Sequence, residues 1–148
     1  MPHLHAPGLV LNLDPDELLG QGAEYTCAED DSAATPQYFV CIEADARQGL
    51  WLPLYSGPAP GRKGMAGTLK SGSPQWTRSP SFYHPGELWR ATHKAVQRSA
   101  LAARDRSTPK LPNTLALAAL PPRDAFPPDT AFRPGANLRR AAGSARPY

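Results

Sequence analysis

Two histidines in the C-terminal half of the sequence, His84 and His93, are the side chains best suited to catalysis by proton transfer. A ribonuclease that works without a metal ion needs a general base, a general acid and cations that stabilise the charge on the phosphate. Arg78 lies near His84 in the sequence and is such a cation. These three residues are the candidate catalytic set of one hypothesis, although His, Arg and Lys also occur together by chance in any basic domain.

Other residues could bind a negatively charged partner without catalysis. The segment 70–84 mixes basic, small hydroxyl and aromatic side chains, which can hold phosphates and stack on bases, although its aromatics could equally cover the core. A helix predicted over residues 85–104 has a basic outer face, and a flexible loop tip at residues 62–63 adds two more cations. The candidate binding residues are Arg62, Lys63, Lys70, Trp76, Arg78, Arg90, Lys94 and Arg98.

Several other kinds of site lack their motif. Gly57 and Gly61 enclose three residues where a P-loop has four, and Gly64 stands where a P-loop has Ser or Thr. His3 and His5 could grip a metal ion, but no further ligand lies at a suitable spacing, so we expect neither a metal nor a cofactor. No serine lies in a Gly-x-Ser-x-Gly motif, which disfavours a hydrolase triad.

The two cysteines, Cys27 and Cys41, are too few for a disulfide framework and have no zinc-ligand spacing. We expect them to be buried thiols of a cytoplasmic protein, and a single bridge between neighbouring strands is the alternative. No apolar run is long enough to cross a bilayer, and no Lys or Arg precedes the short apolar stretch at residues 8–11. The sequence therefore predicts neither a membrane span nor secretion.

Charge is distributed very unevenly along the chain. Residues 1–60 contain nine acidic side chains and one basic side chain, whereas residues 61–148 contain fifteen basic and four acidic ones. This asymmetry favours a basic surface for a polyanion or an acidic partner, unless the two halves neutralise each other within one fold.

The clearest structural signal is a β-hairpin. Residues 37–44 and 50–55 are rich in aromatic, β-branched and other apolar residues and are separated by a loop that contains Gly49. Because side chains alternate across a strand, three residues of each strand should form the core nucleus, namely Tyr38, Val40, Ile42, Leu50, Leu52 and Leu54. Pro53 cannot donate a ladder hydrogen bond, so we expect an edge strand or a bulge there.

Flanking patterns predict shorter elements. Asp14 and Pro15 are typical of the start of a helical turn that ends at Gly20. Additional strands are expected at residues 25–27 and 65–70, and the helix at 85–104 could instead begin near Thr92 after a last strand.

These elements predict an α+β fold, with a small antiparallel β-sheet or half-open barrel, one C-terminal helix and an extended Pro-rich tail. We expect an N-terminal segment at 1–22, a core domain at 23–104 and a tail at 105–148, which is mobile or wraps a surface. A small β-rich domain with a Gly/Pro loop after a hairpin is loosely similar to plasmid growth-inhibitor ribonucleases, a layout shared by many binding modules.

Three functions follow from these observations. The first is a non-catalytic intracellular adaptor or inhibitor that docks through its basic C-terminal half onto a nucleoprotein complex, nucleic acid or acidic protein. The second is a metal-independent endoribonuclease of the toxin type, and the third is an assembly subunit whose tail becomes ordered on a partner.

Overall fold

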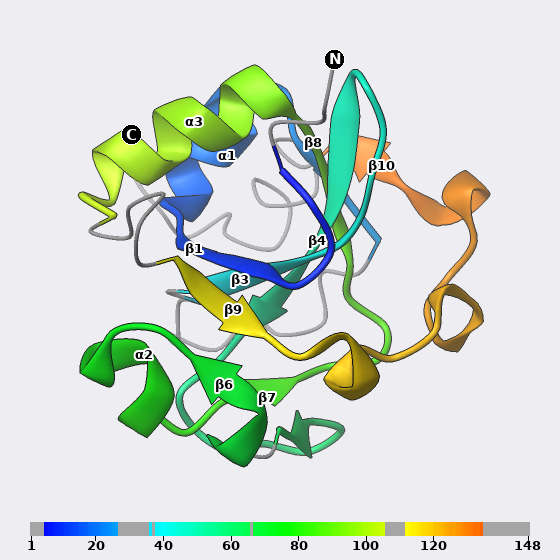
Figure 1. The fold of residues 1–148 in the computed structure, drawn as a ribbon. Coiled ribbons are helices and arrows are strands. Elements are labelled where there is room, and N and C mark those ends of the chain that lie inside the picture. The colour runs from blue at the N-terminus through cyan, green and yellow to red at the C-terminus, as the bar shows by residue number, and fades with distance from the viewer. Residues whose placement is uncertain (1–4, 27–35, 37, 66, 106–111, 135–148) are drawn as a thin grey trace.

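The computed structural model describes residues 5–26, 36, 38–65, 67–105 and 112–134, which form an α+β fold, as predicted. Its centre is an antiparallel sheet in which the eight strands follow the order β10-β2-β8-β4-β3-β1-β9-β6, and β5 and β7 form a second pair (Figure 1). The sheet is open, with edges at β10 and β6, and does not close into a barrel. The strands are β1 (Leu9–Asn12), β2 (Glu24–Tyr25), β3 (Tyr38–Ala44), β4 (Gln48–Leu54), β5 (Lys63–Gly64), β6 (Lys70–Ser71), β7 (Phe82–Tyr83), β8 (Trp89–Thr92), β9 (Asn113–Leu115) and β10 (Arg133–Pro134).

The hairpin is confirmed as β3 and β4, which pair from Tyr38 opposite Leu54 to Ala44 opposite Gly49. A bulge at Ile42 lets both strands keep their apolar residues on the expected face. Five of the six predicted core residues are buried and Tyr38 packs against them half-buried.

The sheet is buried on both faces. One cluster joins Phe39, Cys41 and Trp51 to two helices, α1 (Pro15–Gly20) and α3 (His93–Ala102), which pack side by side (Figure 1). The other cluster contains five residues of the predicted hairpin nucleus. Its buried members are Val10, Val40, Ile42, Leu50, Leu52, Leu54, Trp76, Leu88, Leu115, Phe126 and Phe132.

The structure shows neither the edge strand nor the bulge that was expected at Pro53, because β4 lies between β3 and β8 and the irregularity of the hairpin is at Ile42 on β3. The proline is tolerated because β8 pairs only with residues 48–51 of β4 and therefore does not reach Pro53.

The first residues of α1 and α3 are each determined by a neighbouring capping side chain. Asp14 caps α1 by accepting hydrogen bonds from the backbone N–H groups of Asp16, at 2.9 Å, and Glu17, at 3.2 Å. Residues 85–104 are not one helix. The alternative start near Thr92 is confirmed, because its hydroxyl accepts a hydrogen bond from the N–H of Ala95 and caps α3 after β8.

Two predictions for the middle of the chain need correction. The segment 70–84, in which no helix was predicted, contains the short helix α2 (Pro74–Arg78), which begins at a proline suited to a first helical turn. The strand expected at 65–70 is a 3₁₀ turn, η1 (Gly67–Leu69), followed by the two-residue strand β6.

The sheet uses all three predicted segments of the chain. β1 lies between β3 and β9, and the C-terminal strand β10 pairs with β2, so the sheet extends beyond residues 23–104 on both sides. Between β9 and β10, the 3₁₀ turns η2 (Leu117–Ala119), η3 (Arg123–Ala125) and η4 (Asp129–Ala131) carry the chain over one face. There Phe126 and Phe132 are buried, so this part of the Pro-rich segment wraps its own molecule.

Candidate binding surface

The two candidate catalytic histidines lie at opposite ends of β8. His84 precedes this strand and His93 follows it, and four extended residues alone span on the order of 10 Å. Arg78 lies in α2, away from His93 and α3 (Figure 1). The structure therefore does not bring these three residues together as an acid, a base and a cation.

The imidazole of His84 forms a hydrogen bond within its own loop. Its Nδ1 accepts a hydrogen bond from the N–H of Gly86 at 2.9 Å, so the proton of the neutral ring lies on Nε2. Nε2 faces Gly61, whose φ is +83° and at which a Cβ would lie 3.0 Å from this nitrogen. In this arrangement His84 has no free lone pair with which to act as a general base.

His93 is bound on both ring nitrogens. Its Nε2 lies 2.6 Å from the carbonyl oxygen of Asp45, and its Nδ1 lies 2.9 Å from Nδ1 of His5. The sequence had associated His5 with His3, which lies outside the described residues. The contact with His93 joins positions 88 residues apart, and no local pattern indicates it.

Trp76 and Lys70, two of the predicted binding residues, are buried, and their polar groups are used within the molecule. The indole N–H of Trp76 donates to the carbonyl oxygen of Thr114 at 3.1 Å, and its ring is fully buried. The ammonium of Lys70 donates to Ser79 O at 2.5 Å and Ser81 Oγ at 2.6 Å and lies 4.1 Å from the Trp76 ring centre. Burial lowers the pKa of Lys70. These two residues join α2 to the sheet.

Arg62 supports the loop after β4. Its guanidinium donates to Gly57 O at 2.9 Å and lies 3.9 Å from the ring centre of Tyr55. The Tyr55 hydroxyl donates to the buried carboxylate of Glu87 at 2.7 Å. Arg62 is thus part of an internal network, whereas its neighbour Lys63 is exposed on β5.

Arg90 is neutralised within the fold. It lies on β8 rather than on the predicted helix, pairs with the carboxylate of Glu24 at 2.8 Å, and lies 4.4 Å from the ring centre of Phe132. A cavity of about 380 Å³ beside it is also lined by three carboxylates, those of Glu43, Asp45 and Asp129. Arg90 therefore belongs to an acidic neighbourhood and is poorly placed to attract an anion.

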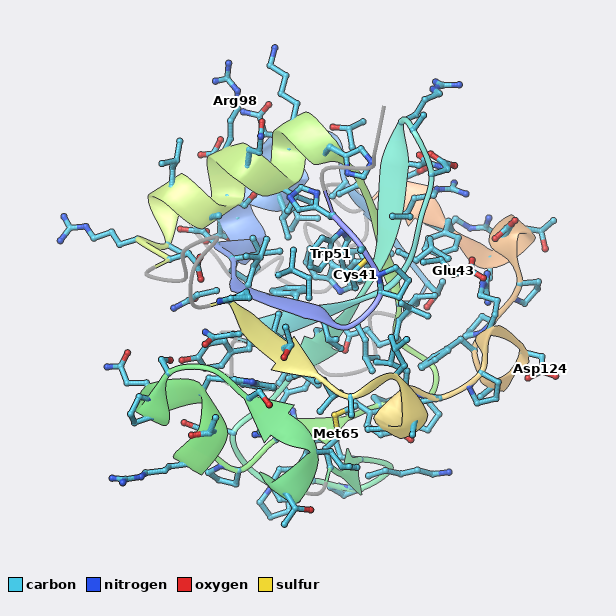
Figure 2. All side chains as sticks on the ribbon, viewed as in Figure 1. Cys41, Glu43, Trp51, Met65, Arg98 and Asp124 are labelled. Atoms are coloured by element: carbon cyan, nitrogen blue, oxygen red, sulfur yellow. The ribbon has the colours of Figure 1, made fainter. Side chains whose placement is uncertain are left out.

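The outer face of α3 keeps the exposed cations. Lys94 and Arg98 are exposed, and neither forms an ion pair with any residue in the described ranges. Figure 2 shows Arg98 directed away from the molecule. Leu101, one turn further along, is 79% exposed, and Arg104 is exposed just past the helix end. Of the predicted binding residues, Lys94 and Arg98 come together here, while Lys63 and Arg78 are exposed elsewhere.

Leu101 is the residue of this face that the sequence analysis missed. It lies outside the predicted apolar face of the helix, yet its spacing of three from Arg98 and seven from Lys94 places it with them on one side. This spacing, together with the apolar side chain, could have indicated from the sequence that Leu101 lies beside the two cations.

The remaining candidate chemistry among the described residues, which include Cys41 but not Cys27, is a reactive thiol or a metal site. Burial raises the pKa of the Cys41 thiol to about 12, which suppresses its reactivity, and this cysteine is a free thiol. Within the described ranges, no three metal-ligating side chains converge.

No described helix has both the length and the apolar character required to span a membrane. Comparisons of the chain with protein-family models, curated proteins and solved structures found no match.

Proposed function

We propose that this protein is a non-catalytic adaptor or inhibitor that docks onto an acidic protein surface through the outer face of α3. The observation that carries the proposal is the group of exposed cations Lys94 and Arg98 beside the exposed Leu101, on a helix whose other face is buried. An arginine beside an exposed apolar side chain is typical of protein interfaces, whose buried centre is apolar and in which Arg is enriched.

A protein partner fits this face better than a nucleic acid. Single-stranded nucleic acid is usually held by cations together with aromatic rings on which bases stack. Trp76 was the main candidate for stacking and is fully buried, and every Trp, Tyr and Phe in the described ranges is at least partly buried. Leu101 offers instead an apolar contact that an acidic protein surface with an apolar centre could cover.

The ribonuclease hypothesis receives less support. It needs an acid and a base within reach of one phosphate, whereas His84 and His93 are separated by β8 and both use ring nitrogens in internal hydrogen bonds. The hypothesis of an assembly subunit concerns a tail at residues 105–148, of which 106–111 and 135–148 lie outside the described ranges and 112–134 pack on this molecule itself. A cytoplasmic location is part of the proposal and agrees with the free thiol of Cys41.

A comparison of two charge-matched double variants tests the proposal. The variant Lys94→Glu/Arg98→Glu reverses the face of α3, and Lys63→Glu/Arg78→Glu makes the same change in charge at exposed positions on β5 and α2. Each purified protein is used to capture partners from lysate of its native cells, with and without nuclease treatment, and the affinity for the captured protein is then measured at several salt concentrations.

We expect wild type and the β5/α2 variant to bind one acidic protein, and the α3 variant to lose at least tenfold in affinity with an unchanged melting temperature. Equal affinity of all three proteins would refute docking through α3. Recovery that disappears after nuclease treatment would replace the protein partner with a nucleic acid.

A further inference from the structure

A buried pair of histidines fastens the N-terminal segment to two other elements. His5 is only 5% exposed, and its ring meets the ring of Trp51 edge-on, with 5.4 Å between centroids. Its Nδ1 lies 2.9 Å from Nδ1 of His93, the first residue of α3. His93 in turn contacts Asp45 in the turn between β3 and β4. The pair therefore joins residues 5–8, α3 and the hairpin turn.

The neighbours fix where the protons of this pair lie. The carbonyl oxygen of Asp45 can only accept, so Nε2 of His93, 2.6 Å away, must carry a proton. In the neutral pair, Nδ1 of His93 is consequently an acceptor, and the hydrogen between the rings belongs to Nδ1 of His5. Both contacts of His93 are then satisfied without any charge.

One added proton leaves the contact intact, but a second proton breaks it. A singly charged His93 donates from both nitrogens, to Asp45 O and to Nδ1 of His5, while His5 carries its own hydrogen on Nε2. If both rings are charged, both Nδ1 atoms carry hydrogens that face each other across 2.9 Å. Neither atom can accept, so the hydrogen bond is lost and two positive charges repel.

Two acidic residues, Asp45 in the turn and Glu43 on β3, line a cavity together with Pro7 of the N-terminal segment. The carboxylate of Asp45 accepts from the N–H groups of Arg47 and Gln48, at 2.8 and 2.9 Å. Arg47 in the turn and Lys94 and Arg98 on α3 are cations, which oppose the addition of a second proton to the pair. Consistently, burial and the charge of His93 lower the pKa of His5 to about 4.

We propose that His5 and His93 form a proton-sensitive latch that holds residues 5–8 against α3 and the hairpin turn at neutral pH and releases them in acid. The release is local, since β1 stays paired with both β3 and β9. The inference is independent of docking through α3, because it concerns the N-terminal segment and not the exposed cations.

Hydrogen exchange at single residues, followed by NMR, tests the latch. The reporter is the N–H of Leu9, which donates to Ala6 O at 3.1 Å in the turn next to His5. We expect its protection factor to be constant from pH 8 to 5.5 and to fall at least tenfold by pH 3.5. The core amides of Val40 and Leu52 should stay protected throughout.

Two variants make the result specific. His5→Phe keeps an aromatic ring beside Trp51 but cannot be protonated, so the acid-dependent change at Leu9 should disappear. His84→Gln removes a histidine that is not part of the latch and should leave the change as in wild type. The latch is refuted if Leu9 stays protected at pH 3.5, if His5→Phe shows the same loss, or if Val40 and Leu52 lose protection together with Leu9.

Long-range proton–nitrogen spectra of the imidazole rings provide a second test. At neutral pH they should show a hydrogen on Nδ1 of His5 and on Nε2 of His93. A hydrogen on Nε2 of His5 together with a bare Nδ1 on that ring at pH 8 would contradict the proposed arrangement of protons.

Discussion

Lys70 and Trp76 belong to residue types that often contact nucleic acid, yet each directs its polar group into the molecule. The Lys70 ammonium lies among Ser79 O, Ser81 Oγ and the Trp76 ring, in a site where burial lowers its pKa. A charged donor whose partners are internal contributes to folding, because its removal leaves buried acceptors without hydrogen bonds.

Lys70→Ala should therefore destabilise the protein by about 1–3 kcal/mol, since Ser79 O and Ser81 Oγ lose a donor. Lys63→Ala, at an exposed lysine, is the matched control and should change the free energy of unfolding by less than about 0.5 kcal/mol. Urea denaturation measures both values. If both substitutions change the free energy of unfolding by the same small amount, Lys70 is not structural and becomes a candidate binding residue again.

His5 should make the stability of the protein depend on pH. Its pKa is about 4 in the folded protein, compared with 6.5 without burial. Between these values the unfolded chain binds a proton that the folded protein does not bind, so stability is complete above pH 6.5 and falls as the pH drops toward 4. The full loss from this group is about 3 kcal/mol.

Urea denaturation at pH 7 and pH 4.5 measures this loss, and comparison with His5→Phe separates it from the titration of carboxylates. We expect the difference between the two pH values to be smaller in His5→Phe than in wild type. An identical difference in both proteins would show that His5 does not have a depressed pKa.

At the scale of elements, local patterns predict the structure where hydrogen bonds are local. The alternation in β3 and β4 fixes the core face of the hairpin, and Asp14 places the start of α1. Strands β9 and β10 could not be found in this way, because a strand of two or three residues is stabilised by distant partners and has no period of its own. The ion pair between Arg90 and Glu24 depends on the same pairing of β8 with β2.

Exposure is equally hard to read from sequence. Lys70 and Lys94 are identical in charge, but one is buried beside α2 and the other is exposed on α3. Helical spacing did indicate the position of Lys94 and Arg98 on an outer face, because that face is determined within one element.

Leu52→Ala should cost about 2–5 kcal/mol, because Leu52 is fully buried at the centre of the β3–β4 hairpin. Leu117→Ala, at a leucine that is 66% exposed, is the control and should have little effect. Thermal unfolding followed by circular dichroism compares them. A Leu52→Ala variant that melts within a degree of wild type would overturn the assignment of this core.

At the scale of the whole molecule, the C-terminal segment completes the fold. β9 separates β1 from the edge strand β6, and β10 covers the side of β2 that β8 leaves free. Phe126 and Phe132 bury their rings against the hairpin cluster. The described part of the Pro-rich segment is therefore integral to the sheet.

A chain that ends at Asp105 should lose cooperative unfolding, because β1 and β6 lose their shared partner β9 and the hairpin cluster loses two aromatic rings. A chain that ends at Pro134 keeps every described strand and should unfold with a single transition. Calorimetry distinguishes the two. A sharp transition in the shorter chain would mean that residues 112–134 are dispensable for the core.

The strand order also determines when each strand can pair during synthesis of the protein. β1 is among the first strands to leave the ribosome, but its neighbour β9 lies about a hundred residues later in the chain, and β2 waits still longer for β10. At about 5–20 residues per second, the nascent chain has unpaired strands for several seconds. Such open edges can pair with other chains, so translation speed and chaperone access should influence how much of this protein reaches its native state.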